Sequence, residues 1–395
     1  MLTSHDPYGF VDLLDDAESS ALARLRAVLE TEVEPLLAEN WERGTFPEQI
    51  VAPLAALNLM DPSEFRGATD ADHALYRGFR NFELARTDVS VATFYNGQAG
   101  LFRTSVELGG SAAQVADLSA RIRSFDLRGA FALTEPDHGS DVARGLETTA
   151  RRDGDDWIID GRKRWIGSAV LADVIVVFAR TAANANDEGE EGIGAFLVPR
   201  DAAGVTMTTM TGKIALRIVQ NSDIDLVGVR VPESARLARV TTFADVGRML
   251  GAMRADVAWI AVGAQAGAFE AAATYVRERE QFGRLIGGFQ LVQERLATML
   301  GHLTASLALI VRLTQRQAAG LSTDEDSALA KMWTAARLRE SVALGREVAG
   351  GNGILLEHRL ARYFADAEAV YSYEGTHDIN ALIVGRGITG LSAFR

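Results

Sequence analysis

The sequence predicts an α+β chain of three packed parts, in which a β-rich middle separates two helical regions. Residues 1–127 carry apolar side chains at helical spacing and show no strong strand-like alternation. Runs of β-branched residues replace that pattern over 128–237, and longer helical stripes return over 238–395. Because a 3.6-residue period is typical of amphipathic helices and β-branched runs are typical of buried strands, we expect three domains with these bounds.

The N-terminal domain is expected to be helical from its first apolar stripe. Ala21, Leu25, Val28 and Leu29 recur at helical spacing. The stripe continues through Val33, Leu36 and Leu37. Side chains at this spacing share one face of a helix, which predicts that this face is buried.

The middle domain is expected to form a sheet. Residues 174–178, 195–198 and 224–231 are short β-branched or apolar runs of strand length. The polar stretch 152–156, which contains a glycine, lies between two further strand-like runs and predicts a hairpin turn. Residues 182–192 are rich in Asn, Asp, Glu and Gly without an apolar period, so we expect a solvated loop there.

Three apolar stripes predict long helices in the C-terminal domain. The stripes are Val257, Ala261, Ala264 and Ala268; Val292, Leu296, Met299, Leu300 and Leu303; and Leu329, Met332, Trp333 and Ala336. Gly320–Asp324 reads as a turn between two of these helices. Gly350–Gly353 follows a helical run rather than a strand, which favours a helix C-cap over a dinucleotide-binding loop.

Composition excludes several classes of function. The 395 residues include no cysteine, which rules out disulfides, thiolate metal sites and cysteine nucleophiles. A formal charge of −13 argues against nucleic-acid binding. The six histidines lack metal-ligand spacing, so we expect no metal site. The N-terminus shows no signal-peptide pattern and the apolar run 257–269 is too short to span a bilayer, so we expect a cytoplasmic protein without membrane contacts.

Three polar segments stand out as sites of chemistry. They are Phe131–Asp141 (FALTEPDHGSD) at the entry to the β region, Arg277–Gly283 (REREQFG) with Gln290 soon after, and Tyr371–Asp378 (YSYEGTHD) near the C-terminus. Each alone has a structural explanation. The first contains a turn, the second fits a charged helix face, and Thr376 fits a helix N-cap with Asp378 in the first turn.

The order and spacing of these segments resemble the acyl-CoA dehydrogenase family over essentially the whole chain. The run Tyr373–Ile379, continued by Ala381–Ile383 and Gly385-Arg386, is most similar to the C-terminal signature of the glutaryl-CoA dehydrogenase branch. The resemblance implies an N-terminal helical domain, a β-barrel-like middle domain and a C-terminal four-helix bundle. It also implies FAD and the oxidation of an acyl-CoA thioester to its trans-2-enoyl-CoA, in fatty acid or amino acid catabolism.

Glu374 occupies the position of the family's catalytic base. In the family this carboxylate takes the α-proton while the flavin N5 takes a β-hydride. The substrate thioester oxygen is held there by the backbone N–H of the base and a flavin hydroxyl. A carboxylate in a water-excluded pocket suits this role because burial raises its pKa and makes it a stronger base.

The resemblance assigns the cofactor-binding residues position by position. Those expected to contact FAD are Phe131, Leu133, Thr134, Gly139, Ser140, Trp165, Ile166, Gly167, Ser168, Arg279, Phe282, Gln290, Glu347, Gly350, Gly351, Thr376 and Asp378. In the family, Arg279, Gln290 and the 347–351 segment reach the FAD of a neighbouring subunit. The resemblance therefore implies a homotetramer, and an electron-transfer flavoprotein as the electron acceptor.

The substrate residues implied by the resemblance lie in all three domains. They are Ala92, Tyr95, Ser140, Arg254, Tyr373, Gly375 and Arg386. Arg254 matches a helix arginine near the base and the CoA arm, and Arg386 matches a CoA contact. Local arginines are needed because the anionic CoA would otherwise meet an unfavourable overall charge.

Two positions depart from the family pattern. The glutaryl branch pairs the distal substrate carboxylate with an arginine where this chain has Ala92, and the acidic partner of that arginine falls on Ala85. A buried substrate carboxylate left unpaired is costly, so we expect that glutaryl-CoA is not the substrate and that no decarboxylation follows. In addition, Gly167 stands where the family has a threonine beside the flavin, with Ser168 next along the chain.

Two other functions remain open from the sequence. One is an oxygen-using oxidase or monooxygenase of the same fold, which Gly167 favours and Glu374 disfavours. The other is a non-catalytic member of the fold, which the retained base and flavin-contacting residues disfavour.

Overall fold

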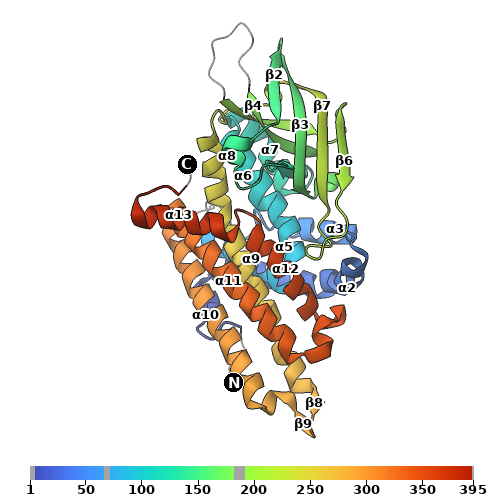
Figure 1. The fold of residues 1–395 in the computed structure, drawn as a ribbon, viewed down its shortest axis with the longest axis vertical. Coiled ribbons are helices and arrows are strands. Elements are labelled where there is room, and N and C mark those ends of the chain that lie inside the picture. The colour runs from blue at the N-terminus through green and yellow to red at the C-terminus, as the bar shows by residue number, and fades with distance from the viewer. Residues whose placement is uncertain (1–4, 66–71, 182–191, 394–395) are drawn as a thin grey trace. The chain divides into compact units, whose positions relative to one another are not determined.

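The computed structural model describes residues 5–65, 72–181 and 192–393, and Figure 1 shows its helices and strands. Contacts divide the chain into two compact units. The first, helical unit comprises residues 1–93, 214–218 and 254–395, and the second, sheet-containing unit comprises 94–213 and 219–253.

The helical unit is built from α-helices and short turns of tighter or wider helix. Its N-terminal elements are η1 (Phe10–Leu13), α1 (Asp16–Val28), η2 (Leu29–Val33), α2 (Glu34–Arg43), η3 (Glu48–Ile50), α3 (Val51–Ala56), α4 (Ala74–Thr87) and the start of α5 (Val89–Asn96). Its C-terminal elements are most of α9 (Phe243–Glu278), β8 (Glu280–Gln281), β9 (Arg284–Leu285), η7 (Ile286–Gly288), α10 (Gln290–Ala318), α11 (Asp324–Val348), η8 (Gly350–Ile354), η9 (Leu356–His358), α12 (Leu360–Ser372) and α13 (His377–Thr389).

Helix α11 is central to the C-terminal part of this unit. It packs against α10, α12 and α13, and Figure 1 shows these helices beside it. Thr323 caps its N-terminus by accepting a hydrogen bond from the Asp326 N–H, while the Asp326 side chain accepts one from the Thr323 N–H. Such a capping box satisfies N–H groups that an isolated helix end leaves without partners.

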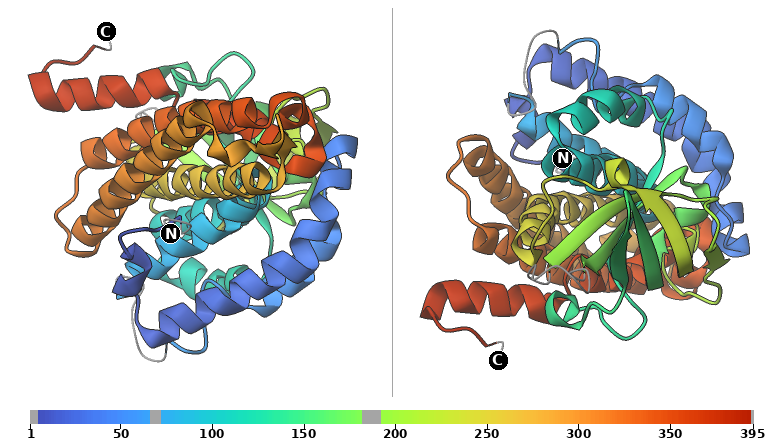
Figure 2. Two further views of the ribbon diagram at one scale, coloured as in Figure 1. Left: turned by 90° about the horizontal axis from the view of Figure 1, so that it is seen from below. Right: turned by 90° about the horizontal axis from the view of Figure 1, so that it is seen from above.

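The sheet-containing unit holds a seven-stranded sheet together with the helices that follow α5. Its elements are η4 (Gly97–Phe102), α6 (Arg103–Gly109), α7 (Ala112–Arg123), β1 (Gly129–Ala132), α8 (Val142–Gly145), β2 (Thr149–Asp153), β3 (Asp156–Gly167), η5 (Ala169–Leu171), β4 (Val174–Thr181), β5 (Gly192–Pro199), β6 (Val205–Thr209), β7 (Asn221–Pro232) and η6 (Glu233–Ala235). The strand order is β1-β4-β2-β3-β7-β6, with β5 also paired to β4, and the right-hand view of Figure 2 shows the strands curling.

Two apolar cores stabilise this sheet. One lies among the strands and includes Trp157, Phe196 and Ile224. The other joins the sheet to the helices and includes Phe102 and Phe178. The β-branched run Val174–Phe178 therefore forms β4, whose alternate side chains enter both cores, as expected for a strand buried on two faces.

Most of the elements expected from the sequence are confirmed. Among the described residues, no strand precedes Gly129, and the three C-terminal stripes lie on α9, α10 and α11. The predicted hairpin joins β2 to β3, with Asp153 opposite Asp156 and a left-handed φ of 67° at Gly154. Gly350, with φ 58°, follows the end of α11 as the predicted C-cap region requires.

The predicted loop over 182–192 is only partly described. Residues 182–191 lie outside the described part of the chain, and Gly192 was assigned wrongly because it begins β5, where it pairs with Thr181 of β4. A glycine at a strand end carries no side-chain signal that would distinguish it from the loop before it.

The expectation about membrane-spanning length overlooked one helix. Helix α10 is 29 residues long and contains an 18-residue window with a mean hydropathy of 1.6, which is long and apolar enough to cross a bilayer by composition alone. A core helix of a globular protein meets the same criterion, and α10 packs against both α11 and α4.

Candidate active site

Glu374 lies in a short connection between α12 and α13 whose backbone is held in an unusual conformation. Tyr373 is extended, whereas Glu374 and Gly375 are both left-handed, with φ of 54° and 81°. A left-handed backbone costs a residue with a Cβ atom roughly 1–2 kcal/mol, so surrounding contacts must hold Glu374 in place. Thr376 then begins α13 as its N-cap and accepts a hydrogen bond from the Ile379 N–H, as the sequence predicted.

Two side chains hold this connection through its backbone carbonyls. The ammonium of Lys331, from α11, donates to the carbonyl of Tyr371 at 3.2 Å and to that of Gly375 at 2.7 Å. The amide of Asn380 donates to the carbonyls of Gly375 and Thr376 at 2.9 and 3.0 Å. Both side chains are fully buried, so the backbone around Glu374 is fixed from two directions.

The carboxylate of Glu374 is placed where it can act as a base. Its Oε2 atom is buried and has no hydrogen-bond partner among the described residues. Burial raises the pKa of Glu374, and the repulsion from Asp256 adds to this rise, while the charges of Arg254 and Lys331 oppose it. An oxygen that is buried, unpaired and more basic than usual is available to accept a proton from a ligand.

The two arginines predicted to meet CoA converge on one turn at the start of α11. Arg254, buried on α9, forms an ion pair with Asp324. Arg386, exposed on α13, lies 3.4 Å from Glu325. An anionic ligand would therefore compete with these two carboxylates for the same guanidinium groups.

The predicted acyl-pocket position Ala92 is buried on α5, next to a residue that contacts the Glu374 connection. The hydroxyl of Thr93 lies 3.4 Å from that of Tyr373. Burial raises the pKa of Tyr373, and hence its phenol stays neutral. Tyr95 belongs to the other unit, where its buried ring contacts Phe125.

The predicted flavin residues of the sheet-containing unit are joined through β3. The Arg164 N–H donates to the carbonyl of Thr134 at 2.9 Å, which fixes the segment after β1 beside the end of β3. Beneath it, the buried ammonium of Lys163 donates to the Leu133 carbonyl at 3.1 Å and to the Glu135 carboxylate at 2.8 Å. Glu135 also accepts hydrogen bonds from the N–H groups of Glu147 and Thr148.

Trp165 lies at the end of β3 in a conformation that exposes its ring. The pairing of β3 with β7 shifts register between Lys163 and Ile166, and Trp165 there has a left-handed φ of 65°. A bulge of this kind redirects a side chain, and the indole is 52% exposed although it is large and apolar. An exposed indole on a fixed backbone fits a planar cofactor ring such as a flavin.

The neighbours of Trp165 share this end of the unit. Ile166 is buried, Gly167 is half-buried, and Ser168 is again left-handed, with φ 56°. A Cβ atom added at Gly167 would meet nothing closer than 3.9 Å, so this chain leaves room there for a larger residue. The remaining predicted contacts comprise the half-buried Phe131 and Thr134, the buried Leu133 and the exposed Gly139 and Ser140.

A third group of predicted residues is exposed at the C-terminal ends of α9 and α11 and at the N-terminal end of α10. It consists of Arg279, Phe282, Gln290, Glu347, Gly350 and Gly351. Helix α9 ends at Glu278, so Arg279 leaves the helix rather than extending its charged face. Phe282 occupies the turn of the β8–β9 hairpin and is 93% exposed, while Glu347 pairs with Arg295.

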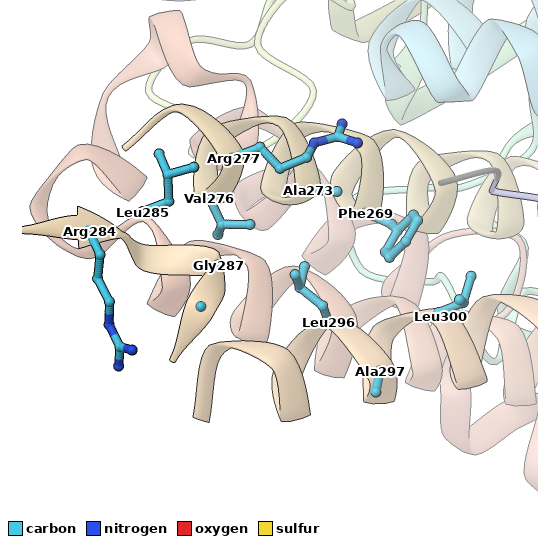
Figure 3. Close-up of a pocket in the computed structure, with 11 residues that line it drawn as sticks. Phe269, Ala273, Val276, Arg277, Arg284, Leu285, Gly287, Leu296, Ala297 and Leu300 are labelled. Atoms are coloured by element: carbon cyan, nitrogen blue, oxygen red, sulfur yellow. The ribbon is translucent and has the colours of Figure 1, made fainter. Parts of the chain in front are cut away.

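A cavity of about 640 Å³ lies beside this hairpin. Figure 3 shows its lining, from α9 on one side and α10 on the other. Phe269, Val276 and Leu300 make it largely apolar, and the guanidinium groups of Arg277 and Arg284 flank it. None of the residues of the Glu374 connection lines it, so this cavity is separate from the predicted base.

The structure also gathers three potential metal ligands, although the sequence predicts no metal site. Asp15, Glu18 and His73 bring one ligand atom each within 4.8 Å of the others. Asp15 and Glu18 form the capping box of α1, and Glu18 also lies 3.0 Å from His73. The helix cap explains the contact of Asp15 with Glu18, whereas His73 Nε2 is buried without a hydrogen-bond partner among the described residues.

Sequence reasoning missed the two buried lysines that support the candidate site. Lys331 holds the base connection, and Lys163 holds the predicted flavin-contacting segment. A signal was present: among the 40 Lys and Arg residues, only positions 163, 213 and 331 are lysine. In a chain that uses arginine almost everywhere, a lysine is a candidate for a position that uses its compact ammonium.

Comparison with known proteins gives the same family along the chain. The N-terminal, middle and C-terminal domain models of acyl-CoA dehydrogenase match residues 15–125, 130–229 and 243–389. Two solved structures of glutaryl-CoA dehydrogenase from Mycobacterium smegmatis, one in complex with FADH2, each cover 98% of both chains. Their TM-scores are 0.90 and 0.89, at 34% and 32% identity.

Two curated relatives are named as a subunit of a reductase complex and as a short-chain dehydrogenase. The caffeyl-CoA reductase–Etf complex subunit CarC of Acetobacterium woodii is 30% identical, over 88% of this chain and 92% of its own length. The mitochondrial short-chain specific acyl-CoA dehydrogenase of Bos taurus is also 30% identical, over 91% of this chain and 87% of its own length. The chain therefore belongs to the acyl-CoA dehydrogenase family of FAD-binding oxidoreductases, which act on CH–CH groups.

Proposed function

We propose that this protein dehydrogenates an acyl-CoA thioester to the trans-2-enoyl-CoA, with Glu374 as the base that removes the α-proton. The observation that carries this proposal is the buried, unpartnered Oε2 of Glu374. A structural acid in this position would be expected to use that oxygen in a hydrogen bond, because buried polar atoms normally have partners. A base must keep it available until substrate arrives.

The backbone beside Glu374 supplies a second element of the reaction. No described residue accepts a hydrogen bond from the Glu374 N–H. An N–H fixed by a rigid connection is suited to the substrate thioester oxygen, on which negative charge accumulates as the α-proton leaves. Proton acceptor and oxyanion donor would thus come from the same residue, with their relative geometry set by its left-handed backbone.

Within the sheet-containing unit, the cofactor would be held by Thr134, Ser140 and the Trp165–Ser168 segment. When bound, FAD supplies the acceptor for the β-hydride, a step for which no side chain of the protein is suited. The protein's own part is to position the acyl chain, hold the α-proton near Glu374 and keep water out.

The acyl group is proposed to be uncharged. Ala85 and Ala92 are both buried and bring no charge to the predicted acyl pocket, and the nearby contact of Thr93 with Tyr373 joins two neutral hydroxyls. A distal carboxylate bound there would lose its hydration without gaining a cation. The cost of an unpaired buried charge is at least ~3 kcal/mol, which corresponds to roughly 100-fold in binding or rate.

Steady-state kinetics with an acyl-CoA panel test this specificity. We expect kcat/KM for glutaryl-CoA to be about 100-fold or more below the best of butyryl-, isobutyryl- and isovaleryl-CoA. The matched variant Ala85→Glu/Ala92→Arg restores the ion pair of the glutaryl branch. It should bring kcat/KM for glutaryl-CoA closer to that for the best neutral acyl-CoA. Efficient turnover of glutaryl-CoA by the unaltered enzyme would show that the carboxylate finds another partner.

The assembly and partners proposed here rest on exposed groups and on relatives. Phe282 and the third group of predicted cofactor residues are exposed, as expected if a neighbouring subunit covers them in a homotetramer. An electron-transfer flavoprotein is proposed as the acceptor because the CarC relative is named as a subunit of an Etf complex. We further propose a cytoplasmic enzyme of fatty acid or amino acid catabolism.

An oxygen-using oxidase or monooxygenase is the second candidate, because Gly167 lacks the hydroxyl expected beside the flavin. Reoxidation after anaerobic reduction by substrate distinguishes the two functions. For a dehydrogenase we expect reoxidation by air to be much slower than turnover with an artificial acceptor. Gly167→Thr, which the local space accommodates, is the matched variant: an oxidase that depends on the glycine would lose its oxygen reactivity in it.

A further inference from the structure

Lysine is confined to three positions in this chain, and all three ammonium groups bind backbone carbonyls. Lys163 contacts the Leu133 carbonyl, and Lys213 contacts the Val219 carbonyl and the Asn221 side chain, both at 2.6 Å. Lys331 contacts two carbonyls, those of Tyr371 and Gly375. Lysine therefore occurs only where its ammonium fixes a backbone segment.

Lys331 differs from the other two because its contacts lie on both sides of the predicted base. The Tyr371 carbonyl belongs to the last turn of α12, and the Gly375 carbonyl follows Glu374. The last carbonyls of a helix lack partners within it and carry partial negative charge, so an ammonium there acts as a cap. The same group then fixes the peptide immediately after the base.

An arginine would not perform this task equally well. The ammonium is compact and directs its three donors at separate angles, whereas a guanidinium is planar and extends further. Lys331 is 0% exposed and reaches its two carbonyls from inside the helical unit, where a larger head group would displace the connection. The buried position also places a positive charge beside Glu374.

We propose that Lys331 is a positioning residue for the base: its ammonium fixes the Tyr371–Gly375 segment on both sides of Glu374, and so holds the carboxylate in the orientation and ionised form that proton removal requires. This inference rests on the function proposed above. It adds to that function a residue on another helix that acts only through Glu374.

The electrostatic environment supports this role. Burial raises the pKa of Glu374, and the two opposing cations are Arg254 and Lys331. Arg254 is already paired with Asp324, while Asp256 on the same helix raises the pKa further. Other ionisable groups close to the base along the chain are Tyr373, which stays neutral, and His377, which stacks on Tyr371.

Loss of the Lys331 charge is expected to shift the pH dependence of activity. Glu374 must be ionised to accept a proton, so activity falls as pH drops through its pKa. Removing the Lys331 charge removes an interaction that lowers this pKa. The acid limb of the pH profile should therefore move to higher pH.

The experiment compares three variants of the FAD-loaded enzyme. In Lys331→Met we expect the acid limb of kcat to move up by about one pH unit and kcat at neutral pH to fall by about 10- to 100-fold. The isotope effect with α-deuterated substrate should increase while KM changes little, because proton removal and not binding is affected. Lys331→Arg, which keeps the charge but not the geometry, should lower kcat with less change in the acid limb.

Lys213→Met serves as the matched control, because it removes the half-buried lysine whose carbonyl contacts lie in the other unit. Its acid limb should coincide with that of the unaltered enzyme. If Lys331→Met does not yield folded, flavin-loaded protein, the same measurements on Lys331→Gln, which retains a donor, replace it. An unchanged acid limb and isotope effect in the folded variant would overturn the proposal.

The design separates failure of this inference from failure of the proposed function. Should Glu374→Gln retain activity, the base itself is misassigned and the proposed function fails. Should Glu374→Gln be inactive while Lys331→Met keeps the normal pH profile, only the role of Lys331 is refuted.

Discussion

Replacing Glu374 with glutamine is expected to lower kcat by about 10⁴-fold while leaving the fold and the bound FAD intact. Glutamine preserves the size and shape of the side chain but cannot accept the α-proton, and general-base removal typically costs about 10²–10⁴-fold. The upper end is expected because the buried Oε2 of Glu374 has no hydrogen-bond partner among the described residues and is free to accept the proton. The measurement is kcat with an artificial electron acceptor at several pH values.

A surface glutamate on α12, the helix that precedes the Glu374 connection, provides the control. Glu368 lies six residues before the base, is exposed on α12 and forms an ion pair with Arg339. Glu368→Gln should retain full activity, which separates loss of the base from a general effect of removing negative charge. Near-normal turnover by Glu374→Gln would mean that the base lies elsewhere.

Breaking the buried ion pair of Lys163 and Glu135 is expected to give the largest loss of stability. Both side chains are almost completely buried, and the two charges are 2.8 Å apart. Removing one member of such a pair leaves the other without compensation and typically costs about 3–5 kcal/mol. Lys163→Met should therefore lower the thermal midpoint of the FAD-loaded enzyme and weaken its retention of FAD, because the Leu133–Glu135 segment loses its support.

Two substitutions of Glu135 distinguish the loss of its charge from the loss of its hydrogen bonds. The N–H groups of Glu147 and Thr148 donate to different oxygens of Glu135. Glu135→Gln keeps an acceptor for one of them, so it should be less destabilising than Glu135→Leu, which keeps none. Differential scanning calorimetry and flavin content after gel filtration are the readouts. Unchanged thermal stability and flavin content in Lys163→Met would show that the pair is dispensable.

Local patterns in the sequence were sufficient for most of the fold. The β2–β3 hairpin, the β4 strand and the three long stripes depend on neighbouring residues, and the structure has all of them. Glu374 and Thr376 were assigned from one short motif that resembles the acyl-CoA dehydrogenase family, and the role of Glu374 as base stays a prediction. Thr376 was identified as an N-cap from its residue type and position alone.

Features that depend on contacts between residues far apart in the sequence could not be predicted from local patterns. The contact between Lys331 and Gly375 joins residues 44 positions apart. The rarity of lysine marks Lys331 as unusual in this chain but does not show which residues it contacts. The left-handed backbone of Glu374 likewise follows from the contacts that surround it, because its own side chain disfavours that conformation. Arg254 was predicted near the base, but its pairing with Asp324 depends on the packing of α9 against α11.

The central claim is that the protein removes hydrogen from an uncharged acyl-CoA, and anaerobic titration of the oxidised enzyme tests it most directly. Each acyl-CoA of the panel is added without oxygen while the flavin absorbance is followed, with the Glu374→Gln variant in parallel. We predict that a neutral short- or branched-chain acyl-CoA bleaches the flavin of the unaltered enzyme within the turnover time, and that the variant binds the same ligand without bleaching. Absence of bleaching with every acyl-CoA, or equal bleaching in the variant, would contradict the account.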